Sequence, residues 1–400
     1  MVKKKKHILF IVENNPVPLD GRVWKEAKVA RDLGYQVSII SPIHKLAKER
    51  YIRLEGIDIF RHPMPIEGDS KAGMLLEYAN ALFWELLLSF RIYFRRRFDI
   101  IHGANPPDHL FIVALFFKPL GVKFIFDHHD IAPENFFAKF GKKGILYRVL
   151  LLMEWLTFKT TNLIVSTNES YRRIAIERGG KNPKNVIILR NGPDLDRVKP
   201  VKPNPSKWKG GFDYLIGYVG VIGEQEGIEN ILDIADYIVN QKSIANIKFI
   251  IVGTGPHLKV LIKHCLRMGL DNYVYFTGYI PDEELYELLS TVDICVNPEY
   301  NNEFTDKSTM IKILEYMTFS RPIIQFYTTE GEISAGEAAL YIRENSTTLF
   351  AEKLLELLKD EKSRSKMGSL GRARIEKELS WNIQREKLKK IYNSIIPLEG

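Results

Sequence analysis

Short apolar runs alternate along the chain with longer stretches whose apolar residues recur at helical spacing. The runs are rich in Ile, Val and Phe, which is typical of strands buried on both faces of a parallel sheet. Strands are predicted at residues 7–13, 36–41, 57–61, 99–102, 123–127, 163–167, 186–190, 214–220, 247–252, 273–277, 293–297 and 322–326. Helices are predicted at residues 21–33, 72–97, 107–117, 144–160, 169–178, 227–240, 256–268, 282–290 and 308–318, and from about 346 onward.

The alternation is interrupted once, between residues 193 and 211, by four prolines and a glycine pair. Such a segment is typical of a linker. Strand–helix alternation on both sides of it predicts an α/β protein with two doubly wound parallel sheets. Ligands of such sheets bind outside the carboxyl ends of the strands. We expect one domain at residues 1–195, a linker at 196–211 and a second domain at 212–379.

Charge is distributed unevenly between the two halves of the chain. Residues 1–200 carry 33 Lys and Arg and 21 Asp and Glu, a net charge of +12, while the remainder carries 24 and 28, a net charge of −4. A basic half favours an anionic partner. No nucleic-acid motif or row of aromatics suited to base stacking is recognisable, so a phosphorylated substrate or acidic lipid is the preferred partner. The two cysteines fit a reducing cytoplasm.

The predicted helix at 72–97 combines apolar and basic residues. No run of 18 uncharged apolar residues exists, so no transmembrane helix is expected. An apolar helix with basic residues beside it fits either a peripheral helix on an anionic membrane surface or a helix that packs on a sheet. The candidate membrane-surface residues are Trp84, Leu88, Arg91, Arg95, Arg96 and Arg97.

The segment 302–325 is the most informative one in the chain. A polar loop leads into a helix that is predicted to begin near Ser308, because Ser308 and Thr309 are good N-cap residues. Helix N-termini favour anions. Lys307 and Lys312 add positive charge at the same end, and Glu315 follows one turn later. This loop therefore suits a diphosphate with a carboxylate nearby for a sugar hydroxyl, although an ordinary capped amphipathic helix has the same pattern.

Six short motifs in a fixed order resemble those of the retaining glycosyltransferases of family 4, which adopt the two-domain GT-B fold. The resemblance covers nearly the whole chain, and in this family the final helix, here 380–400, crosses back onto the first domain. The motifs are Asp127-His128-His129-Asp130, Asn191-Gly192-Pro193-Asp194, Tyr218-Val219-Gly220, Val252-Gly253-Thr254-Gly255-Pro256, Phe276-Thr277-Gly278-Tyr279 and Lys312-Ile313-Leu314-Glu315-Tyr316-Met317.

This resemblance implies transfer of a hexosyl group, with retention at the anomeric carbon, from a nucleotide-diphosphate sugar. It further implies Rossmann-like domains that face an interdomain cleft, and no metal or other cofactor. The enzymes it resembles most build polysaccharide or lipid-linked oligosaccharide. The acceptor would be one of these, and the protein would be peripheral on the inner face of the cell membrane.

The donor residues implied by the resemblance match the family pattern unevenly. Glu315 matches the second carboxylate of the paired-glutamate motif, but the first carboxylate is replaced by Lys307. The basic pair after the first strand of the second domain is also missing, so we expect Lys307 and Lys312 to hold the diphosphate. The candidate donor-binding residues are Gly223, Gly253, Gly255, Lys307, Ser308, Thr309, Lys312 and Glu315.

His129 aligns best with the active-site histidine of the family, with His128 as the alternative. The expected catalytic residues are therefore His129, Glu315 and Lys307. Arg22, at a helix start, is expected either to meet an acceptor phosphate or to pair at the surface with Asp20. The candidate acceptor-binding residues are Asp20, Arg22, His128, Asp130 and Glu134.

Two other functions fit the same pattern. A sugar-nucleotide epimerase of GT-B architecture would act on the nucleotide sugar without an acceptor. The absence of the first motif glutamate favours a different alternative, a catalytically weak subunit that binds a nucleotide sugar within a transferase complex. Turnover of a bound nucleotide sugar separates these possibilities.

Overall fold

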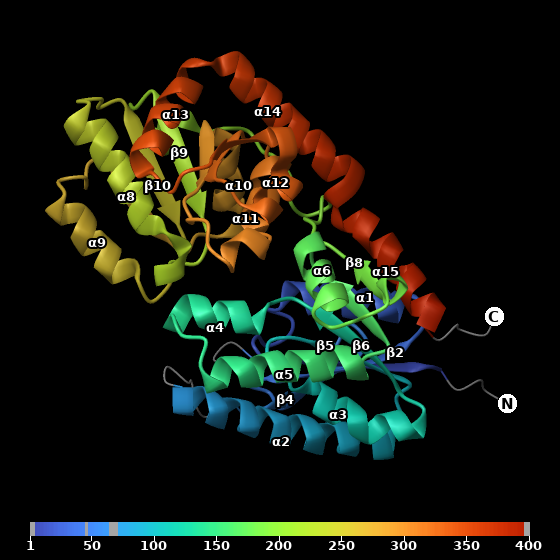
Figure 1. The fold of residues 1–400 in the computed structure, drawn as a ribbon. Coiled ribbons are helices and arrows are strands. Elements are labelled where there is room, and N and C mark those ends of the chain that lie inside the picture. The colour runs from blue at the N-terminus through green and yellow to red at the C-terminus, as the bar shows by residue number, and fades with distance from the viewer. Residues whose placement is uncertain (1–4, 45–46, 64–70, 396–400) are drawn as a thin grey trace. The chain divides into compact units, whose positions relative to one another are not determined.

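The computed structural model describes residues 5–44, 47–63 and 71–395, and its chain forms two compact units. Unit 1 contains residues 1–191 and 384–400, and unit 2 contains residues 192–383. Each unit is a parallel sheet covered by helices (Figure 1). The boundaries predicted from the sequence were 195 and 380.

Unit 1 is built on an eight-stranded sheet in the order β3-β4-β2-β1-β5-β6-β7-β8. All neighbours are parallel except β3 and β4, which form an antiparallel edge. The strands are β1 (His7–Val12), β2 (Gln36–Pro42), β3 (Tyr51–Leu54), β4 (Ile57–His62), β5 (Ile100–Ala104), β6 (Lys123–His128), β7 (Leu163–Ser166) and β8 (Val186–Ile188).

Helices α2, α3 and α5 lie together along one side of this sheet (Figure 1). Their inner faces pack on the apolar core that includes Leu9, Phe124 and Phe126. The helices of unit 1 are α1 (Gly21–Asp32), α2 (Lys71–Arg95), α3 (Leu110–Phe117), α4 (Ala132–Phe140), α5 (Ile145–Thr160), α6 (Glu169–Glu177) and most of α15 (Trp381–Ile395).

Unit 2 has a six-stranded parallel sheet in the order β11-β10-β9-β12-β13-β14. Strand order reverses between β9 and β12, which makes that crevice the expected ligand position of a doubly wound sheet. The strands are β9 (Tyr214–Val219), β10 (Ile247–Val252), β11 (Val274–Gly278), β12 (Ile294–Asn297), β13 (Ile323–Phe326) and β14 (Ala339–Ile342). The helices are α7 (Pro205–Trp208), α8 (Ile228–Asp236), α9 (Leu258–Arg267), α10 (Asp282–Thr291), α11 (Ile311–Thr318), α12 (Thr329–Ala335), α13 (Thr347–Lys359) and α14 (Glu361–Arg374).

The predicted linker, residues 196–211, packs on unit 2 instead of forming a free connection. Trp208 is buried, and its indole N–H donates to Glu287 in α10 over 2.8 Å. The backbone amides of Val201 and Asn204 donate to the hydroxyls of Ser290 and Thr291. The proline-rich composition indicates an irregular segment, but these side-chain acceptors hold it against α10.

Five elements of the described chain were not predicted: β3, β14, α4, α7 and α12. β3 is an edge strand whose residues alternate between exposed and half-buried, so it lacks the apolar run that marks the buried strands. α4 has Pro133 near its start and is short, which hides its helical periodicity. All twelve predicted strands are present, with ends that differ by at most a few residues.

Candidate active site

The loops after β9 and β10 meet at the carboxyl edge of the unit 2 sheet. Gly220 N donates to Val252 O over 3.1 Å, and Ile222 N donates to Thr254 O over 3.0 Å. A Cβ at Gly253 would collide with Gly220 O, and one at Gly255 would collide with Ile222 O. These two predicted donor-site glycines therefore allow one loop to lie directly on the other.

Lys312 lies in the first turn of α11 and reaches the crevice between β9 and β12. Its Nζ is 2.6 Å from Glu299 Oε1, 3.0 Å from Glu226 Oε2 and 3.3 Å from the Tyr218 hydroxyl. Glu226 follows β9 and Glu299 follows β12, so the lysine links the two loops at the point where strand order reverses. The sequence pattern predicts a lysine available to a diphosphate, whereas in the structure this lysine is a buried cation between two carboxylates.

The electrostatics of this lysine cluster depend on burial. Burial raises the pKa of Glu299 to about 7, against the lowering effect of Lys312. Burial alone would lower the pKa of Lys312, but Glu299, Tyr218 and Glu226 outweigh it and raise that pKa well above its ordinary value. Lys312 therefore stays charged, while the partner carboxyl titrates near neutrality.

The loop before α11 differs from its prediction. A 3-10 turn, Thr305–Lys307, comes first, and α11 starts only at Ile311 with Met310 as its N-cap residue. The prediction that Ser308 and Thr309 cap the helix is wrong: Ser308 is buried, and its hydroxyl donates back to Phe304 O over 2.8 Å. The turn forms in place of the cap because side chains stabilise it. The Asn302 side chain accepts from the amides of Phe304 and Thr305, and the Thr305 hydroxyl accepts from the amide of Asn302.

Asp306 in this turn accepts hydrogen bonds from the amide and hydroxyl of Thr329 at the start of α12, over 2.7 and 3.1 Å. It thereby fixes the turn that ends at Lys307. Lys307 and Glu315 are both half-buried, and Gly223 lies half-buried in the loop after β9. The roles of Gly223, Lys307 and Glu315 toward a donor stay predictions.

In unit 1, His129 follows β6 and is held by Asp127. His129 Nε2 lies 2.5 Å from Asp127 Oδ2, and the His129 side chain is 14% exposed while Asp127 is fully buried. The same carboxylate binds Arg22, whose Nε and Nη2 donate to Oδ2 and Oδ1 over 3.1 and 2.8 Å. A buried carboxylate bound by a guanidinium orients a histidine whose ring has an exposed edge.

This cluster contains three more buried side chains. Glu26 Oε1 is 3.2 Å from Arg22 Nε, and His102 Nδ1 is 3.0 Å from the Tyr392 hydroxyl of α15. Burial favours a raised pKa for Asp127, but the charges of Arg22 and His129 outweigh it and hold that pKa well below its ordinary value. Burial and the Asp127 charge raise the pKa of Glu26 well above its ordinary value.

Glu26, His102 and Asp127 have ligand atoms close enough together for a metal ion. Arg22 already bridges both carboxylates, and the Tyr392 hydroxyl already contacts His102. The set is therefore a charge-compensated polar network, and we assign no metal to it.

Asn105, at the end of β5, fixes the backbone that carries His129. Its Oδ1 accepts from the amides of His129 and Asp130 over 2.6 and 3.2 Å, and its Nδ2 donates to Asp130 O and Asp108 Oδ1. Asp130 itself accepts from Ile131 N and Asn135 Nδ2. No sequence pattern indicates Asn105, because its role depends on β5 and β6 lying side by side.

Four predicted acceptor residues have structural partners instead. Arg22 is buried on Asp127, so the predicted surface pair with Asp20 is wrong, and the contact with an acceptor phosphate stays a prediction. Asp20 caps α1 by accepting from Val23 N over 2.9 Å. Glu134 is buried and paired with Arg178 at 2.7 Å.

His128 is the fourth of these residues and belongs to the core. It is fully buried and lies between the rings of Phe126, Phe158 and Tyr171, with centroid distances of 5.5, 5.3 and 5.0 Å. Burial lowers the pKa of His128 to about 3, so the ring is neutral. Of the two adjacent histidines, His129 is the one at the edge of the sheet.

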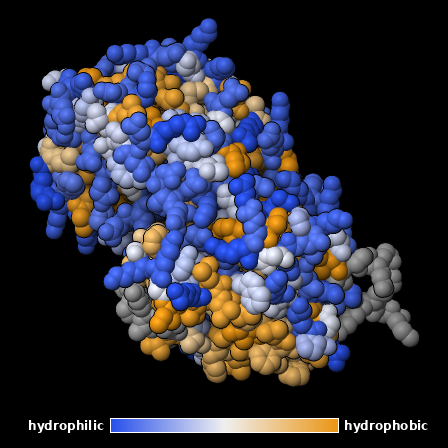
Figure 2. All heavy atoms as spheres, in the orientation of Figure 1, coloured by the Kyte–Doolittle hydropathy of each residue, from blue (hydrophilic) through white to orange (hydrophobic). Residues whose placement is uncertain are grey.

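The predicted basic residues lie exposed on α2 and directly after it, but the exposed apolar residues of α2 are not the predicted ones. Arg91, Arg95, Arg96 and Arg97 are exposed, whereas Trp84 is half-buried and Leu88 packs against the core of unit 1. The exposed apolar side chains gather over α2, α3 and α5 (Figure 2) and include Phe83, Leu87, Phe94, Leu115, Phe116 and Ile145. Among the described residues, no helix has the length and apolar content needed to cross a bilayer.

Two family models match the chain in succession. Residues 22–197 match "Glycosyltransferase Family 4", and residues 213–360 match "Glycosyl transferases group 1". An uncharacterised glycosyltransferase of Methanocaldococcus jannaschii is 22% identical over 378 residues, 92% of each chain. A capsular polysaccharide biosynthesis glycosyltransferase of Staphylococcus aureus is 23% identical over 263 residues, 64% of this chain and 67% of that one.

Among solved structures, the Anabaena protein HepE in complex with UDP-glucose superimposes with a TM-score of 0.72. The match covers 97% of this chain and all of that one at 14% identity. At this identity the likeness concerns the fold, and it supports a GT-B architecture with two parallel-sheet domains.

Proposed function

This chain belongs to the family 4 glycosyltransferases of GT-B fold, and from that membership we propose that it is a retaining, metal-independent hexosyltransferase. It moves a sugar from a nucleotide-diphosphate donor to a lipid-linked or polysaccharide acceptor at the membrane surface. The observation that carries the donor assignment is the buried Lys312 at the strand-order reversal of unit 2, between the loops after β9 and β12.

A diphosphate leaving group gains negative charge as its bond to the sugar breaks, and fixed positive groups lower the barrier to that step. Lys312 and Lys307 supply the cations on unit 2, and the amides that open α11 add the positive end of a helix dipole. Glu315, one turn further along α11, takes the ribose hydroxyls. Glu226 is 30% exposed and releases Lys312 toward the incoming phosphate.

On unit 1, the role proposed for His129 is to bind the sugar that is transferred. Its ring is oriented by Asp127, whose own charge is balanced by Arg22. Because Nε2 of His129 donates to the Asp127 carboxylate, Nδ1 of the neutral ring accepts a hydrogen bond from a sugar hydroxyl, while Asp130, on the same loop, binds acceptor hydroxyls. Asp127 and Arg22 act as positioning residues that hold His129 in one orientation.

Membrane association rests on the apolar side chains over α2, α3 and α5, on Arg91 and Arg95 of α2, and on the two arginines that follow this helix. Apolar groups enter the headgroup boundary, and each basic residue near an anionic surface adds about 1 kcal/mol. We expect the protein to sediment with anionic vesicles at low salt and to be released by high salt. Absence of sedimentation at low salt would contradict the membrane assignment.

A thermal-shift panel of nucleotide sugars tests the donor assignment. A donor present at 100 times its dissociation constant is expected to stabilise the protein by about 2.7 kcal/mol. A sugar-free nucleoside diphosphate, added as a control, separates contacts to the base and diphosphate from contacts to the sugar. If no nucleotide sugar raises the melting temperature, the proposed function is wrong.

A catalytically weak, donor-binding subunit is the second candidate. The observation in its favour is Lys307, which stands where the family has its first motif glutamate. Such a protein would show the thermal shift but would neither transfer nor slowly hydrolyse the donor. Release of free sugar from the stabilising donor therefore distinguishes the transferase from the subunit.

A further inference from the structure

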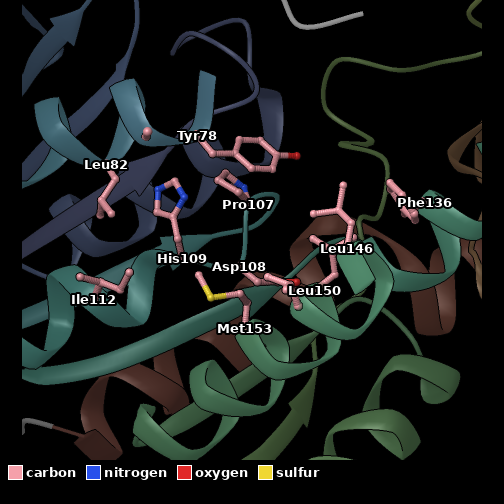
Figure 3. Close-up of a pocket in the computed structure, with 12 residues that line it drawn as sticks. Tyr78, Leu82, Pro107, Asp108, His109, Ile112, Phe136, Leu146, Leu150 and Met153 are labelled. Carbon is pink, nitrogen blue, oxygen red and sulfur yellow. The ribbon is translucent and has the colours of Figure 1, made fainter. Parts of the chain in front are cut away.

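Unit 1 contains a cavity of about 220 Å³ between α2, α3, α4 and α5. Its walls are almost entirely carbon, and Leu82, Ile112, Phe136, Leu150 and Met153 point into it (Figure 3). An apolar cavity of about 150 Å³ already binds a benzene molecule and stays free of water. This cavity is therefore large enough for part of a hydrocarbon chain.

The wall of the cavity continues into the exposed apolar surface of unit 1. Val149 of α5 lines the cavity and is 41% exposed, and Ala79 of α2 also lines it and is exposed. The same helices carry Phe83, Leu87 and Ile145 on their outer sides. A chain in the cavity would thus connect with the surface proposed above to meet the membrane.

The other end of the cavity adjoins the loop that carries His129. Pro107 and Asp108 line the cavity, and Asp108 Oδ1 accepts from Asn105 Nδ2 over 2.8 Å. The same Asn105 side chain holds the amide of His129. Asp108 is 4% exposed, and its Oδ2 has no hydrogen-bond partner among the described residues.

The polar groups at this end are compatible with an apolar occupant. His109 Nε2 is paired with Glu85 Oε2 at 2.8 Å, deep between α2 and α3. Burial, together with the Glu154 charge, raises the pKa of Asp108 well above its ordinary value, which favours the uncharged carboxyl. An uncharged carboxyl with an unpaired oxygen suits a hydroxyl or ester oxygen at the head of a chain.

We propose that this cavity holds the first part of the hydrocarbon chain of the acceptor, with the head group of that lipid at the loop of Asn105 and His129. The proposal rests on the proposed function and narrows its acceptor to a lipid. The position of the cavity sets the occupant: one end reaches the apolar surface of α2 and α5, and the other reaches the residues that hold His129. A polysaccharide would have no use for an apolar channel between these two places.

The test uses the full chain and n-alkyl phosphates of six to twelve carbons, below the concentrations at which they form micelles. Each added methylene buried in the cavity is expected to raise affinity about four-fold until the cavity is full. Titration calorimetry measures this dependence without any donor. Affinity that does not change with chain length would overturn the proposal.

A matched pair of variants on α5 locates the binding. Leu150→Trp fills the cavity and should lower the affinity for decyl phosphate at least ten-fold, whereas Leu152→Trp adds the same ring on the outer side of α5, where Leu152 is 53% exposed. Equal losses in both variants would place the chain on the outer surface and overturn the proposal. Ile112→Phe, a smaller addition on α3, repeats the test if Leu150→Trp does not fold.

The thermal-shift panel of nucleotide sugars distinguishes failure of the cavity proposal from failure of the proposed function. Both tryptophan variants should keep the donor-induced thermal shift, because α5 belongs to unit 1 and the groups proposed to bind the diphosphate and the nucleotide belong to unit 2. A wild-type protein with a donor shift but no chain-length dependence would refute the cavity proposal alone. A wild-type protein without any donor shift would refute the proposed function, whatever the alkyl phosphates do.

Vesicles of phospholipid without acceptor test whether the cavity binds the chains of ordinary membrane lipids instead of the acceptor. If the cavity takes acyl chains of ordinary phospholipids, the Leu150→Trp variant will sediment less with vesicles than the Leu152→Trp variant does. In a separate transfer assay with a purified lipid acceptor, decyl phosphate will then not compete with that acceptor. That result would make the cavity a membrane anchor and overturn its assignment to the acceptor. Competition by decyl phosphate in the wild type, lost in Leu150→Trp, is the result expected.

Discussion

The two units each bury a cluster of one cation and two carboxyl groups at the carboxyl edge of their sheet, but the cation has a different role in each. In unit 1, one cation, Arg22, serves the carboxyls of Asp127 and Glu26 and leaves His129 at the exposed edge. In unit 2, one cation, Lys312, is itself the group closest to the proposed ligand, and Glu226 and Glu299 surround it. The first cluster is complete without a ligand, whereas the second holds its cation with groups that a ligand can replace.

The difference shows how similar residues do different work. The Arg22 fork binds both oxygens of Asp127 and fixes one geometry, as suits a positioning group. Lys312 is a compact charge on a flexible stem, and one of its partners is 30% exposed. A phosphate can displace a partly exposed carboxylate much more easily than it can enter a closed guanidinium pair.

The largest effect should come from Asp127→Asn, which leaves Arg22 and His129 without the buried carboxylate that they share. Removing one member of a buried ion pair costs roughly 3–5 kcal/mol of unfolding free energy. Urea titration measures the loss, and sugar transfer should fall as well because His129 loses its orientation. Asp32→Asn, in an exposed pair with Arg31, is the control and should cost less than about 1 kcal/mol. Equal losses of unfolding free energy in both variants would show that the buried ion pair of Asp127 stabilises the protein no more than an exposed pair does.

Lys307→Ala should affect ligand binding and leave the fold largely intact. A charge-assisted hydrogen bond to the diphosphate contributes roughly 1.5–3 kcal/mol, so donor affinity should fall by about 10- to 150-fold. The control is Lys353→Ala in α13, whose ammonium pairs with Glu356 at the surface. Calorimetry with the donor found in the thermal-shift panel decides it, and an unchanged affinity would remove Lys307 from the donor site.

Glu226→Gln should strengthen donor binding, because it removes one competitor for Lys312. The expected gain is roughly two- to five-fold, the range of a partly exposed ion pair. Glu224→Gln changes a neighbouring carboxylate of the same turn, Glu224–Glu226, and supplies the control. A gain of the same size in both variants would indicate a general charge effect, and no gain would show that Lys312 does not change partners.

The smallest expected effect is a difference between the two clusters in how their contribution to the unfolding free energy changes with pH. The pKa of Glu299 in the fold is about 7, above its ordinary 4.5, so its contribution to stability is present below pH 4.5 and is lost as pH rises through 7. The pKa of Asp127 lies below its ordinary 3.8, so its contribution is present above pH 3.8 and is lost as pH falls further.

Subtracting the unfolding free energies of Glu299→Gln and Asp127→Asn from those of the wild type, pH by pH, isolates the two contributions. The first difference should fall with rising pH and the second with falling pH. Urea titrations from pH 3 to pH 8 provide both curves. Curves with the same slope would mean that the two clusters do not differ in the way described.

The sheets could be predicted because their strands are apolar on both faces, a pattern that depends only on neighbouring residues. The position of Arg22 could not, because its partner Asp127 is 105 residues away and nothing near Arg22 indicates it. The helix start at Ser308 was wrong for a local reason: the Asn302 and Thr305 side chains stabilise a turn that competes with the cap.

The sequence alone is sufficient to choose between His128 and His129 as the residue that leaves the core. In a strand that ends at residue 128, alternation places Phe124, Phe126 and His128 on one face, and two of these residues are phenylalanines. His128 therefore belongs to the core face, and the next residue is the first one free to leave the sheet. The pairing of Lys312 with Glu226 and Glu299 was out of reach, since it needs the reversal of strand order that brings β9 beside β12.

Tyr392 on α15 contacts His102 and completes a network whose other members all precede residue 130. During synthesis, residues 192–383 can collapse into their own unit while the earlier part still lacks its last helix. At about 5–20 residues per second, roughly 10–40 seconds separate the emergence of β8 from that of α15. Unit 1 is thus translated first but completes its fold last. Loss of the final helix would leave a cavity in unit 1.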